Sequence, residues 1–524
     1  MSRSTRAAGR RSAPRANRSR HRSPRARTTS KAIGLTLLSA LVPGSGLLMG
    51  GRKKLGAFVL TISIGLLVIG AYVGLTKRDS ILAFAVSPRQ LLIATAAVVV
   101  LGFCWIWIVV ASHKLLRPVS MTYTGRLAGS MFVGLLCFAI AVPTTVAAQT
   151  VMAQRDLVGS VFQSEGNSKS ATRPKVDKKD PWANTPRLNL LLLGADDGAG
   201  REGTRTDTVI VASIDTKTGD TALISLSRNW MRMQFPTDSP LHKVYPDGYW
   251  DPSLGNVEQP EYYLDSMYDN VPKAHPGILG QTDNEGADVV KLAASATLGL
   301  DIDYYMQVNL AGFRQIIDAV GGITVNVNYR VPIGGDYGDG PGSNSAKKPS
   351  GYIEPGPNQK LDGYHALWFA RGRYGLSDPS RQERQRCTIH ALVNSVNPAT
   401  LVTKYQQIAS AGKQVLRTDI PLDILPAFIE LGLKVKSAKV TNVDLDKNKN
   451  FPTGKNPDYT AMREIIQKAI APASKPVAST PSTTTTKKPS SGSTKKATPK
   501  PAVTPGATEN LNDACAYNPS QTGN

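Results

Sequence analysis

Apolar residues dominate the chain between about residues 32 and 149. A spanning helix needs about 20 apolar residues, and three stretches meet that length. A fourth stretch, 32–50, is shorter and interrupted by a proline and glycines, so we interpret it as a re-entrant or interfacial segment. The three candidate spans run near 55–75, 90–112 and 127–149.

Basic residues around these stretches predict the topology, because lysine and arginine favour the cytoplasmic side of a membrane. The basic N-terminal arm and the run 52–54 belong inside, as does the loop with Lys114, Arg117 and Arg126. The loop with Lys77, Arg78 and Arg89 must then lie outside, although it is also basic. Three spans place everything after residue 150 outside the cell, whereas four would reverse this. We expect three, giving a multi-pass protein of the cell membrane.

Composition divides the rest of the chain into three parts. Residues 150–185 are polar and are interpreted as a stalk, and residues 186–470 have the composition of a globular domain. Residues 471–524 begin with a Pro/Thr/Ser/Lys-rich stretch that should be extended and disordered up to about residue 510. Some ordered character returns around Cys515.

Strand and helix patterns alternate within residues 186–470. The continuous apolar run 188–193 is typical of a strand buried on both faces. Asn309 and Gly321 are placed to begin and end a helix over 309–322. Such alternation predicts an α/β domain, or a three-layer α-β-α domain. The other predicted elements are strands at 208–214, 221–226 and 323–329 and a helix at 286–300.

The formal net charge of +23 is unevenly placed, since residues 1–31 carry ten arginines, one lysine and no acid. This arm has no hydrophobic periodicity and should be disordered. Binding to nucleic acid is one interpretation of the arm. A simpler interpretation is that the arm keeps the N-terminus in the cytoplasm, and the membrane region that follows the arm favours it.

The stretch 370–386 holds five arginines and two acids. Asp378 and the proline after it predict the start of a helix. Helical phase then places Arg381 and Gln385 on its buried side and Glu383 and Arg386 on its outer side.

Arg371 and Arg373 precede this helix and share one face if their segment is a strand. Guanidinium groups match phosphate geometry, and a helix N-terminus favours anions. We therefore expect an oxyanion site here, and the alternative is a surface charge network with Asp378 and Glu383.

A second cluster follows from the strand ends. Asp196 comes just after one predicted strand and Asp207 begins the next, with Arg205 between them. If these strands are neighbours, two carboxylates meet at one sheet edge, which suits Mg²⁺ shared with substrate phosphate. Arg228, after the strand 221–226, adds a further cation. An aspartate in a glycine-rich turn can also be a plain turn residue.

Of the four cysteines, two lie in apolar spans. Cys387 and Cys515 are the two in the exported part, and helical phase places Cys387 on the outer side of its helix. They are therefore the candidates for a disulfide. Nucleotide-binding loops, serine elbows and Cys/His zinc spacings do not occur in the sequence.

Five motifs, spread in order over roughly residues 188–396, resemble the LytR–CpsA–Psr (LCP) family of cell-envelope enzymes. The resemblance implies an α-β-α domain on the outer face of the membrane. It also implies transfer of a glycopolymer from a polyprenyl-pyrophosphate carrier to peptidoglycan, through a phosphodiester bond and with Mg²⁺. The motifs are NLLLLGADDG…GTRTDTVIV, LISLSRNW, LGLDIDYYMQVNLAGFRQIIDAVGGITVNV, LDGYHALWFARGR and SDPSRQERQ.

Residues of this chain that stand at the family's motif positions are assigned the corresponding roles, one residue at a time. The resemblance implies Asp196 and Asp207 as metal ligands, and Asp207, Arg205, Arg371 and Arg373 as catalytic residues. Two positions depart from the family, which often has Pro-Arg-Asp in place of Ser227-Arg228-Asn229 and a lysine in place of Tyr263. The implied pyrophosphate-binding residues are Arg205, Arg228, Arg371, Arg373, Arg381 and Gln385.

Three functions remain open at this point. A phosphotransferase would act on a lipid-linked glycan and peptidoglycan, with Asp207 as one candidate for the general base. A pyrophosphatase would use the same site with water as the acceptor. A regulator would use the basic arm to bind nucleic acid, but the arm lacks interleaved aromatic residues, so we do not expect a nucleic-acid partner.

Overall fold

The computed structural model describes residues 28–76, 84, 87–118, 120, 122–163, 169–177, 180–196, 204–255, 257–336, 347–395, 416–443, 445, 457–471, 509–521 and 523. They form two compact units, one from within 1–78 and 93–149 and one from within 79–92 and 150–524. Residues 1–27 of the basic arm and 472–508 of the tail lie outside the described residues.

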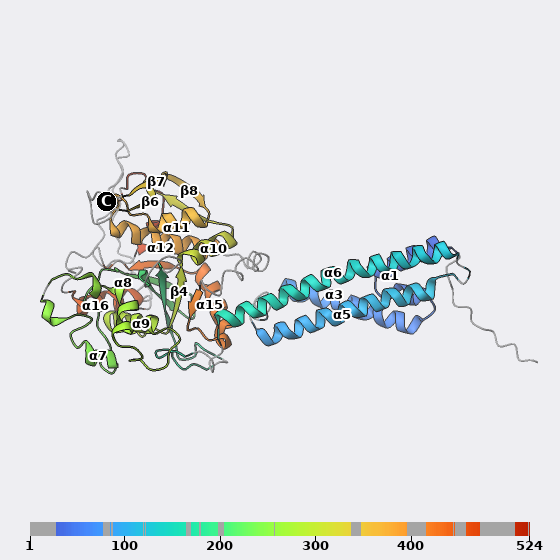
Figure 1. Ribbon diagram of the computed structural model, residues 1–524, viewed down its shortest axis with the longest axis horizontal. Coiled ribbons are helices and arrows are strands. Elements are labelled where there is room, and N and C mark those ends of the chain that lie inside the picture. The colour runs from blue at the N-terminus through green and yellow to red at the C-terminus, as the bar shows by residue number, and fades with distance from the viewer. Residues whose placement is uncertain are drawn as a thin grey trace, which may run out of the picture. The chain divides into compact units, whose positions relative to one another are not determined.

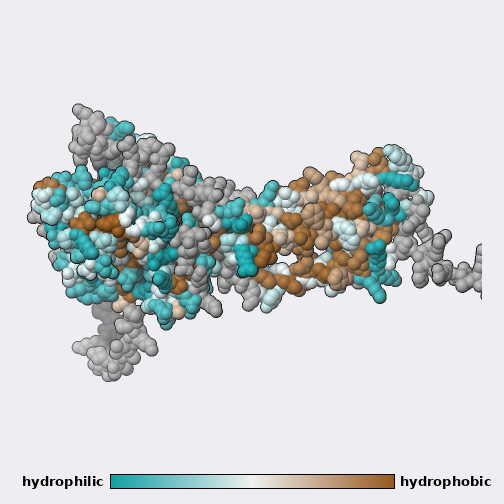
Figure 2. All heavy atoms as spheres, turned by 60° about the horizontal axis from the view of Figure 1, so that its bottom comes forward, coloured by the Kyte–Doolittle hydropathy of each residue, from teal (hydrophilic) through white to brown (hydrophobic). Residues whose placement is uncertain are grey.

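The first unit is helical (Figure 1). Three of its helices, taken over Lys53–Thr76, Pro88–Leu116 and Tyr123–Asp156, are long and apolar enough to cross a membrane. They match the three predicted spans, and their surfaces are hydrophobic (Figure 2). The described helices that lie wholly or largely in this unit are α1 (Thr29–Leu41), α2 (Ser45–Met49), α3 (Lys53–Thr76), α5 (Pro88–Leu116) and α6 (Tyr123–Val161).

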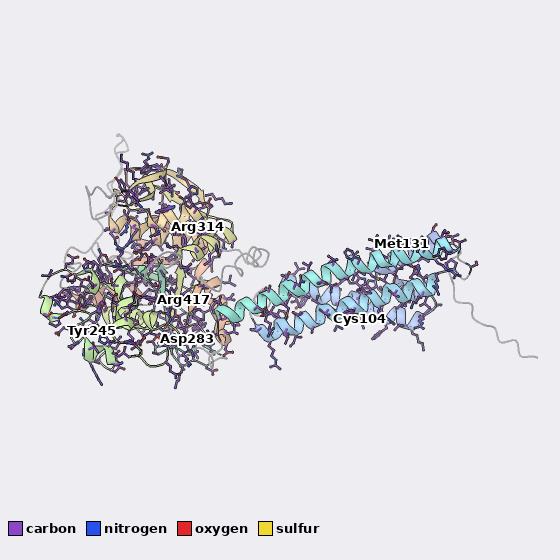
Figure 3. All side chains as sticks on the ribbon, viewed as in Figure 1. Cys104, Met131, Tyr245, Asp283, Arg314 and Arg417 are labelled. Carbon is purple, nitrogen blue, oxygen red and sulfur yellow. A yellow bond between two sulfur atoms is a disulfide. The ribbon has the colours of Figure 1, made fainter. Side chains whose placement is uncertain are left out.

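The predicted re-entrant segment forms two short helices, α1 and α2, which are separated at residues 42–44. Hydrogen bonds attach α1 to α5: Ser39 Oγ donates to Ser112 Oγ at 2.8 Å, and Trp105 Nε1 donates to the Ala40 carbonyl at 2.9 Å. The labelled Cys104 lies beside Trp105 in α5 (Figure 3). The apolar stretch 32–50 is therefore too broken to form a fourth long helix.

The second unit is a mixed α/β domain. Its helices are α7 (Pro240–Val244), α8 (Leu264–Ala274), α9 (Glu285–Leu298), α10 (Leu310–Val320), α11 (Gly363–Arg371), α12 (Asp378–Ser395), α15 (Leu425–Ser437), α16 (Tyr459–Ile470) and α17 (Leu511–Ala514), with 3-10 turns at Pro252–Leu254, Pro260–Tyr262 and Leu422–Ile424. Its strands are β1 (Arg187–Ala195), β2 (Thr206–Asp215), β3 (Thr221–Leu226), β4 (Tyr304–Asn309), β5 (Ile323–Val327), β6 (Val331–Asp336), β7 (Lys347–Ile353), β8 (Gly356–Leu361), β9 (Leu416–Thr418), β10 (Val440–Val443) and β11 (Glu509–Asn510).

Seven strands form the central sheet in the order β11-β10-β3-β2-β1-β4-β9. Strands β1, β2 and β3 are antiparallel neighbours, while β4 is parallel to β1 and β10 is parallel to β3. The end of β1 and the start of β2 therefore meet at one edge, with Ala195 opposite Thr206. The end of β3 lies at this edge too, since Leu226 pairs with Val209.

Alternating residues of β2 supply two cores on the opposite faces of the sheet. Val209 and Val211 pack with α8, α9 and α16, whereas Ile210, Ala212 and Ile214 pack with residues of α15. A strand with apolar residues on both sides needs a layer on each face. The predicted sheet with helices on both faces is therefore what the structure has.

A third core lies under two small sheets, β5-β8 and β6-β7, and is closed by α10, α11 and α12. These elements group together in the upper part of Figure 1. The predicted helix ends are confirmed, because the Asn309 side chain accepts from the Gly312 N–H and Gly321 ends α10 in a left-handed conformation. Strand 323–329 is also confirmed as β5, although it lies outside the main sheet.

The end of the chain is folded against this domain. Strand β11 pairs with β10, and a disulfide joins Cys515 to Cys387 of α12 with a Cα–Cα distance of 5.6 Å. Ser377, just before α12, donates through its N–H and Oγ to the Gly523 carbonyl, at 3.0 and 3.1 Å. The structure thus contains the predicted disulfide.

Part of the predicted stalk also belongs to the folded unit. Residues 150–161 continue helix α6, and the Lys169 N–H donates to the carboxylate of Asp283, which is labelled in Figure 3, at 2.8 Å. Thr172 Oγ1 donates to buried Asp288 at 2.6 Å. A backbone N–H thus binds Asp283 and the hydroxyls of Ser170 and Thr172 bind Asp288, which composition alone did not indicate.

Candidate active site

One edge of the sheet collects the charged residues that the sequence singled out. Asp196 follows β1, Asp207 lies at the start of β2 and Arg228 comes two residues after β3. Helix α11 ends at Arg371, and Arg381 lies in the first turn of α12. Strand ends and helix ends therefore supply every member of the cluster, so the fold fixes their backbone positions.

Asp207 is the carboxylate that these arginines share. Its Oδ1 accepts a hydrogen bond from Arg228 Nη1 at 2.8 Å, and its Oδ2 lies 3.9 Å from Arg371 Nη2. Burial works to raise the pKa of Asp207, but Arg228, Arg381, Arg371 and Arg373 together hold this pKa below its usual range. Asp207 is therefore ionised at neutral pH.

Asp265, in the first turn of α8, is a member of the site that sequence reasoning missed. Its side chain is 2% exposed, and Oδ2 lies 3.5 Å from Arg228 Nη1 and 4.0 Å from Arg205 Nη1. Burial raises the pKa of Asp265, opposed by Arg228 and Arg205 and reinforced by Asp207. In the sequence, Asp265 is an ordinary acid in the stretch YLDSMYDN, and nothing around it indicates a functional role. Its role becomes visible only in the folded chain, where α8 is hydrogen-bonded to the residues that follow β3.

Arg381 is buried at the site, as helical phase predicted, with its side chain 4% exposed. Its Nη2 lies 2.9 Å from Asp378 Oδ1. Burial lowers the pKa of Arg381 to about 10, with Arg228 and Arg373 contributing and Asp378 and Asp207 opposing. The guanidinium therefore stays charged at neutral pH. Gln385 is buried one helical turn further along α12.

Two buried guanidinium nitrogens at the site offer hydrogen bonds. Within the residues that the structure describes, Arg228 Nε and Arg381 Nε have no hydrogen-bond partner in the protein. Buried donors are normally satisfied by protein, water or ligand, so these two are available to an acceptor that enters the site. Both belong to cations, and the acceptor that fits them is an anion.

The segment of Arg371 and Arg373 differs from the sequence prediction. Residues up to Arg371 form helix α11 rather than a strand, and Arg373 is exposed in the following loop. The two residues therefore do not share a strand face. Arg371 still reaches the site, since its Nη2 lies 3.9 Å from Asp207 Oδ2.

Arg386 was expected on the outer side of α12, and this is wrong. Its side chain is buried, and Nη1 donates to Ser225 Oγ of β3 at 3.2 Å. Arg384 is buried too, where it donates to the carbonyls of Phe369 and Gly372. Helix α12 is packed on several sides, so a single apolar stripe could not predict which residues face inward.

Asp196 lies beside the cluster across the strand pair. Its Oδ1 accepts from the Arg205 N–H at 3.1 Å, and its own N–H donates to the Arg205 carbonyl at 3.0 Å. Among the described residues, no group of three or more His, Cys, Asp or Glu is placed to hold a metal. Two carboxylates at one edge still fit Mg²⁺, which is commonly bound by one or two carboxylates, waters and substrate phosphates.

A family model described as the LytR_cpsA_psr family matches residues 157–469. The chain belongs to this family. It is 29% identical over 248 residues to the polyisoprenyl-teichoic acid–peptidoglycan teichoic acid transferase TagU of Enterococcus faecalis, covering 46% of this chain and 64% of that one. It is 26% identical over 260 residues to biofilm regulatory protein A of Streptococcus mutans, covering 47% of this chain and 52% of that one.

The chain thus spans between about half and two thirds of the length of these curated relatives. Among solved structures, a Streptococcus agalactiae protein aligns with a TM-score of 0.38 and 22% identity, over 58% of this chain and 90% of that one. Bacillus subtilis TagV aligns with a TM-score of 0.33 and 20% identity, over 54% of this chain and 97% of that one.

Proposed function

We propose that this protein is a membrane-anchored phosphotransferase that moves a glycopolymer from a polyprenyl-pyrophosphate carrier onto peptidoglycan. The observation that carries the proposal is the pair of buried, unpartnered guanidinium donors on Arg228 and Arg381. Family membership and the printed name of the E. faecalis relative support the reaction class.

The arginines would bind the pyrophosphate and neutralise its charge. Phosphoryl transfer depends mainly on positioning and charge stabilisation rather than on a covalent nucleophile. Arg228 and Arg381 would donate from the buried side, while Arg371 and Arg373 approach from the end of α11 and the loop after it. Arg205, with a half-exposed side chain, would contact the phosphate at the rim, and Gln385 would support Arg381 from within α12.

Asp196 and Asp207 are the residues that would hold Mg²⁺. The ion would supply charge neutralisation on the phosphate oxygens. Asp207 also keeps Arg228 in place through the 2.8 Å contact, and Asp265 holds the same guanidinium from the buried side. A carboxylate in contact with arginines is a weak base, so the acceptor hydroxyl would give its proton to solvent. Its oxygen would bond to the phosphorus that carries the glycan as the bond from that phosphorus to the prenyl phosphate breaks, and the arginines would stabilise the charge on the leaving phosphate.

The proposed location follows from the helices and the disulfide. Three long apolar helices would cross the membrane, with the second unit on the outer side. A Cys387–Cys515 bridge favours this side, because disulfides persist in oxidising compartments. Introduced cysteines at residues 3 and 520, tested with an impermeant thiol reagent on intact cells, should react at 520 only.

The reaction is tested with the full chain in lipid nanodiscs, Mg²⁺ and a short polyprenyl-pyrophosphate oligosaccharide. With soluble peptidoglycan fragments present, mass spectrometry should find a fragment joined to the sugar by a phosphodiester. Release of phosphosugar at the same rate with and without fragments would identify a pyrophosphatase instead. No consumption of the lipid would reject both enzymes.

A further inference from the structure

A cavity lies mainly in the segment between β3 and α8, and the residues placed in the arginine site do not line it. It has a volume of about 570 Å³ and is lined by residues that include Arg232, Gln234, Asp247, Trp250 and Tyr459. This size is typical of small-molecule sites. The polar lining groups are a guanidinium, an amide and a carboxylate, beside aromatic and proline rings.

Arg232 has an unusual backbone at the wall of this cavity. Its φ is 55°, and Asn358 is the other described non-glycine residue with a positive φ. Such a conformation costs free energy in a residue with a side chain and is concentrated at functional sites. Glycine would adopt it without that cost.

Neighbouring residues hold Arg232 in this conformation. Gln234 Nε2 donates to the Arg232 carbonyl at 3.0 Å, and a Cβ added at Gly248 would clash with the same oxygen. The guanidinium carbon lies 5.1 Å from the centre of the Trp250 ring. The contacts with Gln234 and Gly248 therefore hold the backbone of Arg232 in place, and the contact with Trp250 directs its side chain along one wall of the cavity.

Aromatic side chains support this wall from behind. Trp250 packs on Tyr262 with ring centres 5.3 Å apart, and Tyr249 packs on Tyr262 at 5.2 Å. Tyr245, which follows α7 and is labelled in Figure 3, packs on Tyr249 at 5.3 Å. The cavity wall is thus the outer surface of a rigid aromatic cluster.

The cavity lies close to the arginine site along the chain. Arg232 is four residues from Arg228, and four extended residues span at most about 14 Å. The turn between them is held by α8, because the Leu264 N–H donates to the Trp230 carbonyl at 2.9 Å and the Asp265 N–H to the Arg228 carbonyl at 3.0 Å. A short oligosaccharide with its phosphate at Arg228 could reach Arg232.

We propose that this cavity is a carbohydrate subsite of the transferase, with Arg232 and Asp247 as its specificity-determining residues. A planar donor (Arg232), a planar acceptor (Asp247) and an amide that does both (Gln234) suit sugar hydroxyl and acylamino groups, and ring faces suit the apolar face of a sugar. The inference rests on the proposed function for the source of the sugar. Either the acceptor glycan or the glycan of the lipid-linked donor supplies this chemistry.

The test compares Arg232→Gly with Asn358→Gly in the full-length protein in nanodiscs. Both substitutions place glycine at a positive φ, so neither should lower the melting temperature by more than a few degrees. Asp247→Ala removes an exposed rim carboxylate and serves as a second variant. Titration with muramidase-released peptidoglycan fragments and with the lipid-linked oligosaccharide should show a tenfold or greater loss of affinity for one ligand in Arg232→Gly and Asp247→Ala only.

The ligand that is lost identifies the source of the sugar, and the KM for that substrate should rise while kcat changes little. Wild-type affinity for both ligands in Arg232→Gly and Asp247→Ala would overturn the subsite. Binding is measured without turnover, so the subsite can be tested even when no transfer is found. If the wild type binds both ligands and the variants lose one of them, but no transfer is found, the proposed reaction is rejected while the subsite stands.

Discussion

Arg371 reaches Asp207 from the end of a helix, and its side chain is about a quarter exposed. Replacing it should therefore cost little stability, while removing a cation that stabilises the transferring phosphate. We expect Arg371→Ala to lower kcat/KM about 10²- to 10³-fold. Arg371→Lys should recover only part of this, because lysine lacks the bidentate geometry.

The matched control is Arg330→Ala. Arg330 is an exposed arginine just before β6 that pairs with Glu354 and lies over Tyr352. Melting temperature and turnover are measured for both variants. Equal activity of Arg371→Ala and Arg330→Ala would exclude Arg371 from catalysis.

Asp265 is a buried carboxylate that holds two site arginines without reaching the surface. Asp265→Asn keeps the shape but removes the charge, so Arg228 and Arg205 should lose orientation while the fold remains. We expect kcat to fall about tenfold with little change in KM. Asp269→Asn, one helical turn away and bonded to Lys273, should be silent in the same kinetic assay.

Residues of the site were predictable where one strand or helix phase decided their position. Asp207 and Arg381 follow from a strand start and a helix stripe, and both lie at the site. Asp265 and Arg386 depend on which elements pack together, so local periodicity could not place them. Arg373 was expected on a strand and lies instead in the loop that follows α11.

Buried Arg384 joins helix α12 to the end of α11. This buried side chain donates to Tyr329 Oη at 3.2 Å and to the carbonyls at the end of α11. Arg384→Ala would leave these carbonyls buried without partners, at a cost of roughly 3 kcal/mol. Chemical denaturation should show this loss, and Gln382→Ala in the same helix should show much less.

The disulfide gives α12 a second attachment, to the end of the chain. Cys387→Ser with Cys515→Ser should lower the free energy of unfolding by about 2–4 kcal/mol. Protease digestion should then release the segment 509–523 from a protein that otherwise stays folded. Resistance of that segment to protease in the double variant would show that its hydrogen bonds suffice without the bridge.

Elements were predictable where the pattern was long and unambiguous. The three apolar spans, β1–β3 and α10 follow directly from periodicity and helix-ending residues. Strand β5 was predicted, but its partner β8 and the strands β6 and β7 were not, since these three are short and contain glycine and proline. The segment around Cys515 is joined to α12 by a disulfide across 128 residues, the pair that the two exported cysteines predicted.

Stability of the whole domain should depend on pH through Asp303, at the sheet edge where β4 begins. Burial raises the pKa of Asp303 from 3.8 to about 6, with Asp301 and Asp419 contributing and the Asn189 N–H and Lys291 opposing. Between about pH 4 and 6 the unfolded chain loses this proton while the folded chain keeps it. The free energy of unfolding should therefore fall as pH rises through this window.

The shift corresponds to on the order of 3 kcal/mol. Asp303→Asn cannot titrate, so its free energy of unfolding should lack this decline and exceed the wild-type value above pH 6. Urea denaturation at pH 4, 5, 6 and 7 measures both proteins. Parallel pH profiles would show that Asp303 titrates normally in the folded state.

Pyrophosphate binding by the buried arginines is the central claim, and a titration tests it most directly. Full-length protein in nanodiscs is titrated with a short-chain prenyl pyrophosphate and with the matching prenyl monophosphate. The wild type should bind the pyrophosphate at least tenfold more tightly, and Arg371→Ala and Arg228→Ala should lose that preference while Arg330→Ala keeps it. Equal affinity for the two lipids in the wild type would contradict the account.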